Sequence, residues 1–151
     1  MIQLLAPMTG TAIPLDQVPD NAFSRKLLGD GVAILPEEGA ILSPVDGCLS
    51  AISGTLHAYI FSTPDGQEIL VHVGLESVGL QGRGFYPLKQ PGDPVKAGEP
   101  VADVDLLLLK KKGVPLYTPV VVCEGAENMT FTAETGPVTA GQSVVLTLSG
   151  K

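Results

Sequence analysis

The stretch that decides the fold is Gly92-Asp-Pro-Val95-Lys-Ala97-Gly98-Glu-Pro-Val101, because its pattern returns near the end of the chain. The second copy is Gly136-Pro-Val138-Thr-Ala140-Gly141-Gln-Ser-Val144, and both copies carry V-x-A-G-x-x-V. The valines in this pattern favour strands, and the Ala-Gly step predicts a tight turn that accepts no bulky side chain. We therefore expect two related units of strand, turn and strand.

A second echo is a short segment with proline at its second position. It occurs as Ala6-Pro-Met-Thr-Gly10, Ser43-Pro-Val-Asp-Gly47 and Thr118-Pro-Val-Val. Proline is tolerated at the first residue of a strand, where its missing N–H costs least. The spacing is too irregular for a solenoid, so it predicts a duplication folded within one β-sandwich or barrel. Biotinyl and lipoyl carriers use hybrid folds of this kind, so the repeat limits the fold and not the function.

The composition supports an all-β architecture. The 151 residues include 18 glycines, 13 prolines and no tryptophan, which is typical of many short strands joined by frequent turns. The length predicts one domain over residues 1–151. Residues 20–28 and 103–113 each begin with an aspartate and predict short helical segments. The expected fold is an antiparallel β-sandwich, or barrel-sandwich hybrid, with internal duplication and a few helical turns.

The charge of the chain excludes some classes of partner. Sixteen acidic and nine basic residues give a net charge of −7, which argues against a nucleic-acid surface and disfavours an anionic membrane. Cys48 and Cys123 lie far apart, which favours free thiols in a reducing compartment, with a single disulfide as the alternative. No signal peptide or long apolar segment is recognisable, so we expect a cytoplasmic chain without direct membrane insertion.

The only two histidines, His57 and His72, flank a predicted β-hairpin whose turn is the Thr-Pro-Asp-Gly segment at 63–66. If Pro64 and Asp65 are the central turn residues, His57 lies directly opposite His72 and the two rings stand side by side. A type I turn followed by a glycine bulge would shift the register by one residue and put the rings on opposite faces. Spacing alone also allows two core or surface histidines without a function.

A pair of adjacent imidazoles suits phosphoryl transfer. Imidazole is largely neutral near neutral pH, so one ring nitrogen can act as a nucleophile while the other is held by a hydrogen bond. A second imidazole could donate a hydrogen bond to the phosphoryl oxygens. Thr55 precedes His57 by two residues, which places both on one face of a strand, where Thr55 could orient the ring.

Seven segments of the chain together resemble one known family. They are Ala6-Pro-Met-Thr-Gly, Val18-Pro-Asp-Asn-Ala-Phe23, Gly29-Asp-Gly-Val-Ala-Ile34, Ser43-Pro-Val-Asp-Gly47, Thr55-Leu-His-Ala58, Leu70-Val-His-Val-Gly-Leu-Glu-Ser77 and Leu116-Tyr-Thr-Pro-Val-Val. In order and spacing they resemble the glucose-type enzyme IIA of the bacterial sugar phosphotransferase system, from about Ile2 to Leu148. The V-H-x-G-x-[DE]-[ST] box with its upstream T-x-H-A is the most specific part.

The resemblance implies a phosphoryl carrier that requires no cofactor. His72 would accept phosphate from the phosphocarrier protein HPr and donate it to a cysteine of the IIB domain of a sugar permease. His57 would stabilise the phosphoryl group, and Thr55 would bond to His57. The resemblance also implies a shallow apolar depression around the two histidines, and its partner-binding positions map onto Phe23, Leu27, Leu28, Ile60, Leu70, Gly74 and Glu76.

Three departures from the family pattern concern the edge of this site. Ser53 stands where enteric members have an aromatic residue, Leu70 replaces another, and Glu76 replaces the commoner aspartate. We expect docking with the phosphotransferase partners to survive these changes, whereas binding to regulatory protein targets is open. The sequence does not specify the sugar.

Two alternatives share the duplicated β fold. A biotinyl or lipoyl carrier needs a lysine at the tip of a hairpin, and Lys96 lies in the wrong context for that. A zinc-binding hydrolase needs three protein ligands and an activated water, which two histidines with Glu76 or Glu68 supply poorly. His57 and His72 could still bind adventitious zinc if a partner contributed a carboxylate.

Overall fold

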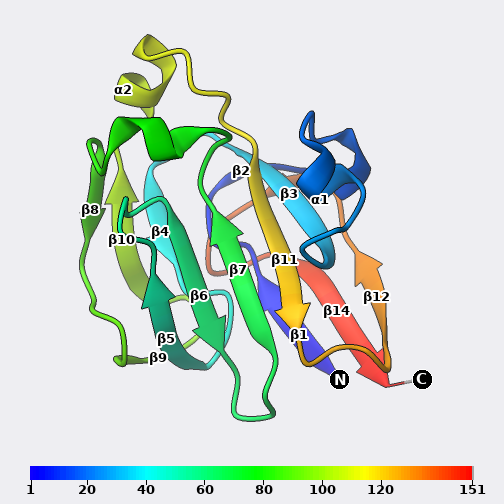
Figure 1. Ribbon diagram of the computed structural model, residues 1–151. Coiled ribbons are helices and arrows are strands. Elements are labelled where there is room, and N and C mark those ends of the chain that lie inside the picture. The colour runs from blue at the N-terminus through cyan, green and yellow to red at the C-terminus, as the bar shows by residue number, and fades with distance from the viewer. Residues whose placement is uncertain (151) are drawn as a thin grey trace.

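The computed structural model describes residues 1–150, which form short strands arranged in antiparallel sheets (Figure 1). The strands are β1 (Ile2–Leu5), β2 (Gly10–Pro14), β3 (Asp30–Pro36), β4 (Ala40–Leu42), β5 (Gly47–Ile52), β6 (Ala58–Ser62), β7 (Glu68–His72), β8 (Phe85–Pro87), β9 (Pro94–Val95), β10 (Pro100–Val104), β11 (Thr118–Glu124), β12 (Met129–Ala133), β13 (Gly136–Val138) and β14 (Val144–Gly150). The helical segments are η1 (Leu15–Gln17), α1 (Asn21–Ser24), η2 (Ser77–Leu80) and α2 (Leu106–Lys111).

The strands form one large sheet and two small ones. The large sheet has eight strands in the order β13-β2-β3-β11-β7-β6-β5-β9, and the small sheets have the orders β1-β14-β12 and β4-β10-β8. One hydrophobic core joins all three sheets, with Leu4 and Leu148 from one small sheet, Ile41 from the other and Phe61 from the large sheet fully buried in it. The predicted antiparallel all-β fold is confirmed.

The predicted duplication is visible in matching hydrogen bonds. The N–H of Gly98 donates to the carbonyl of Ser43 at 2.8 Å, and in the second copy the N–H of Gly141 donates to the carbonyl of Ala6 at 2.9 Å. The two turns lie against each other, since a Cβ on Gly141 would come within 3.3 Å of the Gly98 Cα. Glycine is therefore needed where the copies meet.

Side-chain hydrogen bonds show the same correspondence between the two copies of the repeat. The N–H of Ala97 donates to Asp46 Oδ1 at 2.8 Å, and the N–H of Ala140 donates to Thr9 Oγ1 at 2.9 Å. Asp46 and Thr9 occupy equivalent positions in the first two x-Pro segments described above. The strand pairing agrees as well, because β9 pairs with the start of β5 as β13 pairs with the start of β2.

Both helical segments are shorter than predicted. In α1, the carboxylate of Asp20 accepts a hydrogen bond from the Ala22 N–H at 2.9 Å, but the helix ends at Ser24 because Lys26 adopts a positive φ of 59°. In α2, Asp105 rather than Asp103 caps the helix, since Asp103 belongs to β10. No helix among residues 1–150 is long and apolar enough to cross a membrane.

The segment around η1 and α1 covers only part of the outer face of the large sheet. A second hydrophobic cluster forms there, where Leu15, Val18 and Phe23 pack over Ala33 of β3 and Val121 of β11. Leu70 of β7 lies at the border of this cluster and is only partly buried. In Figure 1, α1 lies over the β3 side of the sheet, and β6 and β7 are left in view. The two histidines are at this uncovered part.

Candidate functional site

The hairpin that carries the histidines contains a glycine bulge. Ser62 pairs with Glu68 and Ala58 pairs with His72, so the register differs by one residue from the prediction that His57 lies opposite His72. The reason is a turn in which the Gly66 N–H donates to the Thr63 carbonyl and Gly66 has a φ of +95°. Only glycine adopts such a backbone at no steric cost, and it adds the extra residue to one strand.

The two imidazoles nevertheless lie side by side. Their ring centroids are 4.8 Å apart, and the ring planes are inclined by 82°. His57 precedes the first residue of β6 and follows Leu56, which has a positive φ of 65°, so the alternation of faces along the strand does not extend to it. The carbonyl of His57 still accepts the Val73 N–H at 2.8 Å, which ties this loop to the end of β7.

The ring of His57 is buried and is held through its Nδ1 atom. Thr55 Oγ1 lies 2.7 Å from this nitrogen, so the predicted contact is present, although both residues lie in the loop before β6 and not on one face of a strand. Ser53 Oγ lies 3.4 Å from the same nitrogen, a contact that the sequence analysis did not foresee. Serine in a loop gives no signal of its own for such a contact.

The ring of His72 is held in one tautomer. Its Nδ1 lies 2.8 Å from the carbonyl oxygen of Gly74, which can only accept a hydrogen bond, so Nδ1 carries the proton and Nε2 of the neutral ring is unprotonated. Gly74 has a φ of +77°, and a Cβ there would meet Val114 Cγ1 at 3.1 Å. The glycine is thus required for the turn that presents this carbonyl. The Phe23 ring packs on His72 with centroids 5.2 Å apart.

Burial lowers the pKa of both histidines below the ordinary value of 6.5. For His57, the adjacent His72 lowers the pKa further, while a hydrogen bond to the backbone of Thr55 opposes the shift. For His72, the Gly74 carbonyl and the charge of Asp20 oppose the effect of burial. Both rings are therefore neutral at pH 7, the state in which an imidazole is a nucleophile.

These shifts predict how stability changes with pH. The unfolded histidines bind protons near their ordinary pKa, whereas the folded ones bind protons only at lower pH, so the unfolded chain holds more protons in that interval. We expect the contribution of the two rings to the free energy of unfolding to be complete above pH 6.5 and to be lost as the pH falls through the folded pKa values.

Two measurements check this expectation. NMR titration of the two imidazoles should give midpoints below 6.5 for both. Denaturant unfolding should show a steeper loss of stability on acidification for the natural chain than for a chain carrying both His57→Gln and His72→Gln. Midpoints above 6.5, or equal pH dependence of the two chains, would contradict the stated environment.

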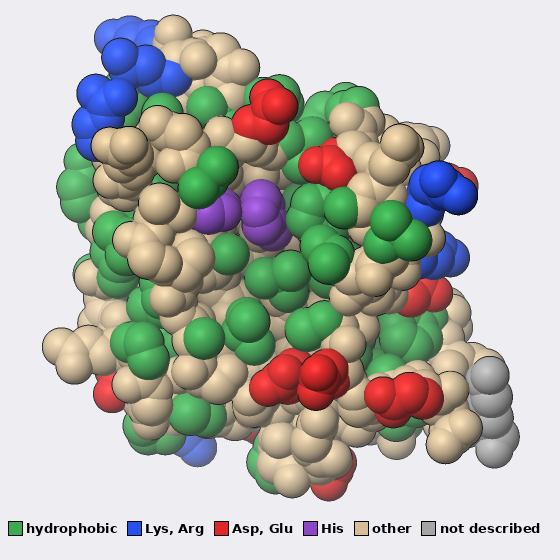
Figure 2. Space-filling view, viewed as in Figure 1, with side chains coloured by type: hydrophobic (Ala, Val, Ile, Leu, Met, Phe, Trp, Pro, Cys, Tyr) green, Lys and Arg blue, Asp and Glu red, His purple; other side chains and the backbone are tan. Residues whose placement is uncertain are grey.

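The predicted partner-binding residues differ in exposure. Leu27 and Leu28 are exposed, at 69% and 44%, and Ile60 pairs with Leu70 on the same outer face as His72. Phe23 is only 3% exposed, because it packs in the cluster with Leu15 and Val18 as well as against His72. Figure 2 shows hydrophobic side chains beside and below the two purple histidines, with acidic side chains above them.

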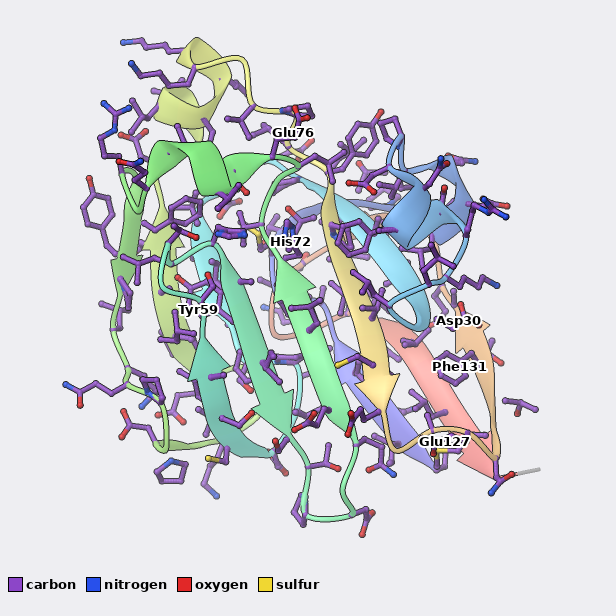
Figure 3. All side chains as sticks on the ribbon, viewed as in Figure 1. Asp30, Tyr59, His72, Glu76, Glu127 and Phe131 are labelled. Atoms are coloured by element: carbon purple, nitrogen blue, oxygen red, sulfur yellow. The ribbon has the colours of Figure 1, made fainter. Side chains whose placement is uncertain are left out.

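Two further residues near the site did not stand out in the sequence. Asp20 caps α1 and its charge acts on His72, which brings a carboxylate toward the ring through the packing of a distant helix. Val78 of η2 is 55% exposed beyond the end of β7. In Figure 3, Glu76 lies above His72, where the chain leaves β7. Glu76 has a positive φ of 60°.

Other chemistry-bearing side chains lie apart from this site. Cys48 and Cys123 are free thiols, as predicted, and burial raises the pKa of Cys123. Lys110 and Lys111 occupy the last turn of α2, where cations are favoured by the helix dipole. Within residues 1–150, no group of three or more histidine, cysteine or carboxylate side chains is arranged to hold a metal ion.

Comparisons with known proteins agree with this architecture. The chain matches the family model for the phosphoenolpyruvate-dependent sugar phosphotransferase system, EIIA 1, over residues 2–128. A glucose-specific EIIA component from Haemophilus influenzae is 39% identical over 147 residues, covering 97% of this chain and 89% of the relative. The solved glucose permease IIA from Mycoplasma capricolum aligns with a TM-score of 0.88 and 36% identity, covering 96% of this chain and 94% of that structure.

Longer proteins contain the same segment. An N-acetylglucosamine-specific EIICBA component from Klebsiella pneumoniae is 38% identical over 150 residues, which are 98% of this chain but 23% of the relative. The fold and these matches define a phosphotransfer component of a sugar transport system. The chain belongs to the EIIA 1 family of the phosphoenolpyruvate-dependent sugar phosphotransferase system, where it serves as a phosphoryl carrier. The zinc hydrolase and the biotinyl or lipoyl carrier are not favoured.

Proposed function

We propose that His72 is the residue that carries the phosphoryl group, receiving it from HPr and donating it to a cysteine of a IIB domain. The observation that carries this proposal is the 2.8 Å contact between His72 Nδ1 and the Gly74 carbonyl. It leaves the lone pair of Nε2 as the nucleophile of the neutral ring. The lowered pKa of His72 supports the same role, because the ring needs no deprotonation at pH 7.

The two transfers balance without a cofactor. In uptake, the P–N bond of the phosphohistidine donor breaks as a P–N bond to His72 Nε2 forms, and the donor imidazole leaves with the electron pair of its own bond. In delivery, the new P–N bond breaks, a P–S bond forms on the acceptor cysteine, and the thiol proton passes to solvent or to a nearby base. Neither step requires a metal ion.

His57 stabilises the transferred group in this proposal. Its ring lies beside His72, and Thr55 Oγ1 lies 2.7 Å from its Nδ1. When the hydroxyl donates to this nitrogen, the proton of neutral His57 resides on Nε2 and can be donated to a phosphoryl oxygen. Donors that are already placed where negative charge gathers are the most effective way to stabilise a transferring phosphoryl group. The Phe23 ring, with its centroid 5.2 Å from that of His72, restricts the motion of the His72 ring.

The partners dock on the apolar surface around the histidines. Leu27 and Leu28 project from the segment after α1, and Ile60 and Leu70 form a partly exposed pair on β6 and β7. Glu76 is exposed at the end of β7, whereas Gly74 is buried and acts through its carbonyl, which holds the His72 ring. The match to an EIICBA component supports IIB and IIC domains as partners. A cytoplasmic location is part of this proposal.

The test is phosphoryl uptake from HPr that has been charged with labelled phosphoenolpyruvate. We expect one phosphoryl group per chain, labile in acid and stable in base, as for a phosphoramidate on histidine. Label that is stable in acid would indicate an ester on serine or threonine and would contradict the proposal. Tight stoichiometric zinc in the isolated chain would instead support the hydrolase class.

A further inference from the structure

The loop that carries His57 is closed by one residue, Ser53. β5 ends at Ile52 and β6 begins at Ala58, and between them the Ser53 N–H donates to the Ala58 carbonyl at 2.9 Å. The carbonyl of Ser53 accepts the Leu56 N–H at 2.9 Å, which stabilises the turn containing the left-handed Leu56. Both Thr55 and His57 lie inside this closed loop.

The side chain of Ser53 has two contacts within the same loop. Its Oγ accepts a hydrogen bond from the Ala58 N–H at 3.2 Å. The Ser53 carbonyl does not accept this N–H, because it accepts the Leu56 N–H instead. The same Oγ lies 3.4 Å from His57 Nδ1. A serine hydroxyl that accepts a hydrogen bond keeps its own hydrogen to donate, and the unprotonated nitrogen of an imidazole is an acceptor.

We propose that Ser53 is a positioning residue for His57: its hydroxyl is a second donor at Nδ1, beside Thr55, and so keeps the proton of neutral His57 on Nε2. This inference deepens the proposed function and rests on it, because Nε2–H is the group that would reach the phosphoryl oxygens. With two hydroxyls donating to one nitrogen, protonation of Nδ1 would remove the acceptor of both. The Ala58 bond fixes the Ser53 Oγ in the position that this requires.

The chain offers a matched control in the same hairpin. Ser50 Oγ donates to the Ile60 carbonyl at 3.1 Å, which is also a bond from a β5 serine to the β6 backbone, but the Ser50 side chain is exposed and touches neither imidazole. Ser50→Ala therefore removes a comparable hydrogen bond without altering the surroundings of His57. Ser53→Thr retains the hydroxyl and serves as the conservative variant.

The experiment is imidazole nitrogen NMR on the unphosphorylated chain at neutral pH. In the natural chain we expect His57 Nδ1 to be unprotonated. In Ser53→Ala the ratio of the two neutral tautomers should shift toward Nδ1–H by about three- to tenfold, the weight of one modest hydrogen bond. Ser50→Ala and Ser53→Thr should give the natural ratio.

Two results would overturn the role of Ser53. One is a folded Ser53→Ala chain whose tautomer ratio matches that of Ser50→Ala. The other is a natural chain in which His57 Nδ1 is protonated at neutral pH, a result that requires no variant at all. These spectra require no phosphoryl transfer, so they test the role of Ser53 independently of the proposed function. Failure of His72 to accept label would refute the proposed function and would leave the result on Ser53 unchanged.

The consequence for transfer follows from the tautomer ratio. If Ser53 selects Nε2–H, delivery from phosphorylated Ser53→Ala to a IIB domain should slow by a similar factor of about three to ten. Rescue of the rate by Ser53→Thr distinguishes this positioning role from general damage to the loop. A normal delivery rate in Ser53→Ala would show that the tautomer does not matter for transfer.

Discussion

A chain carrying His72→Gln is expected to take up no phosphoryl group from charged HPr. The glutamine side chain fills a similar volume but offers an amide nitrogen whose lone pair is delocalised, so no nucleophile remains at this position. Loss of a covalent nucleophile removes nearly all transfer, and we expect uptake below about one-thousandth of the natural rate. The measurement is the initial rate of label incorporation at saturating HPr.

The matched control is the same substitution at the other imidazole, His57→Gln. Both variants lose one ring of the adjacent pair and should retain the fold, because the core lies on the opposite face of the large sheet. If His72→Gln incorporated label while His57→Gln did not, the roles of the two histidines would be exchanged. If both incorporated label, the acceptor would be neither of them.

His57→Gln has the second largest expected effect, and it acts on delivery rather than on uptake. Uptake exchanges one phosphohistidine for another and releases no proton, so it does not require an ionisable group at position 57. Delivery to a cysteine releases the thiol proton. Glutamine has no ionisable nitrogen, so it cannot take up a proton or become positively charged beside the transferring phosphoryl group as an imidazole can. Removal of one placed donor group predicts delivery to IIB slower by about 100- to 1,000-fold.

The check is single-turnover transfer from the phosphorylated variant to a IIB domain, compared with the natural chain under the same conditions. Label should accumulate on the variant and leave it slowly. A His57→Gln chain that delivers its phosphoryl group at the natural rate would refute the role assigned to His57, even if His72 proved to be the acceptor.

The fold could be predicted because the repeat depends on local chemistry. The Ala-Gly steps at Gly98 and Gly141 and the prolines of the x-Pro segments each fix a turn or a strand start from a few neighbouring residues. The lengths of the helices could not be predicted in the same way. α1 stops early because Lys26 adopts a left-handed backbone, where it pairs with Asp30 at 3.4 Å, and such a choice depends on the surrounding tertiary structure.

The site could be predicted only in part for a related reason. The proximity of the two histidines was predicted correctly, but the expected register was wrong by one residue. The bulge at Gly66 shifts the register, and the left-handed backbone of Leu56 turns His57 back toward His72, so the two effects offset each other. The pairing of Thr55 with His57 was a local relation and is confirmed. The approach of Asp20 toward His72 depends on how α1 packs across β11, which a local pattern does not contain.

The most direct measurement is phosphorus and nitrogen NMR of the chain after phosphorylation by HPr. We expect one phosphoryl group, bonded to Nε2 of His72, with the Nδ1 proton retained by the bond to the Gly74 carbonyl. A phosphoryl group on Nδ1 of His72, on His57 or on any other residue would contradict it.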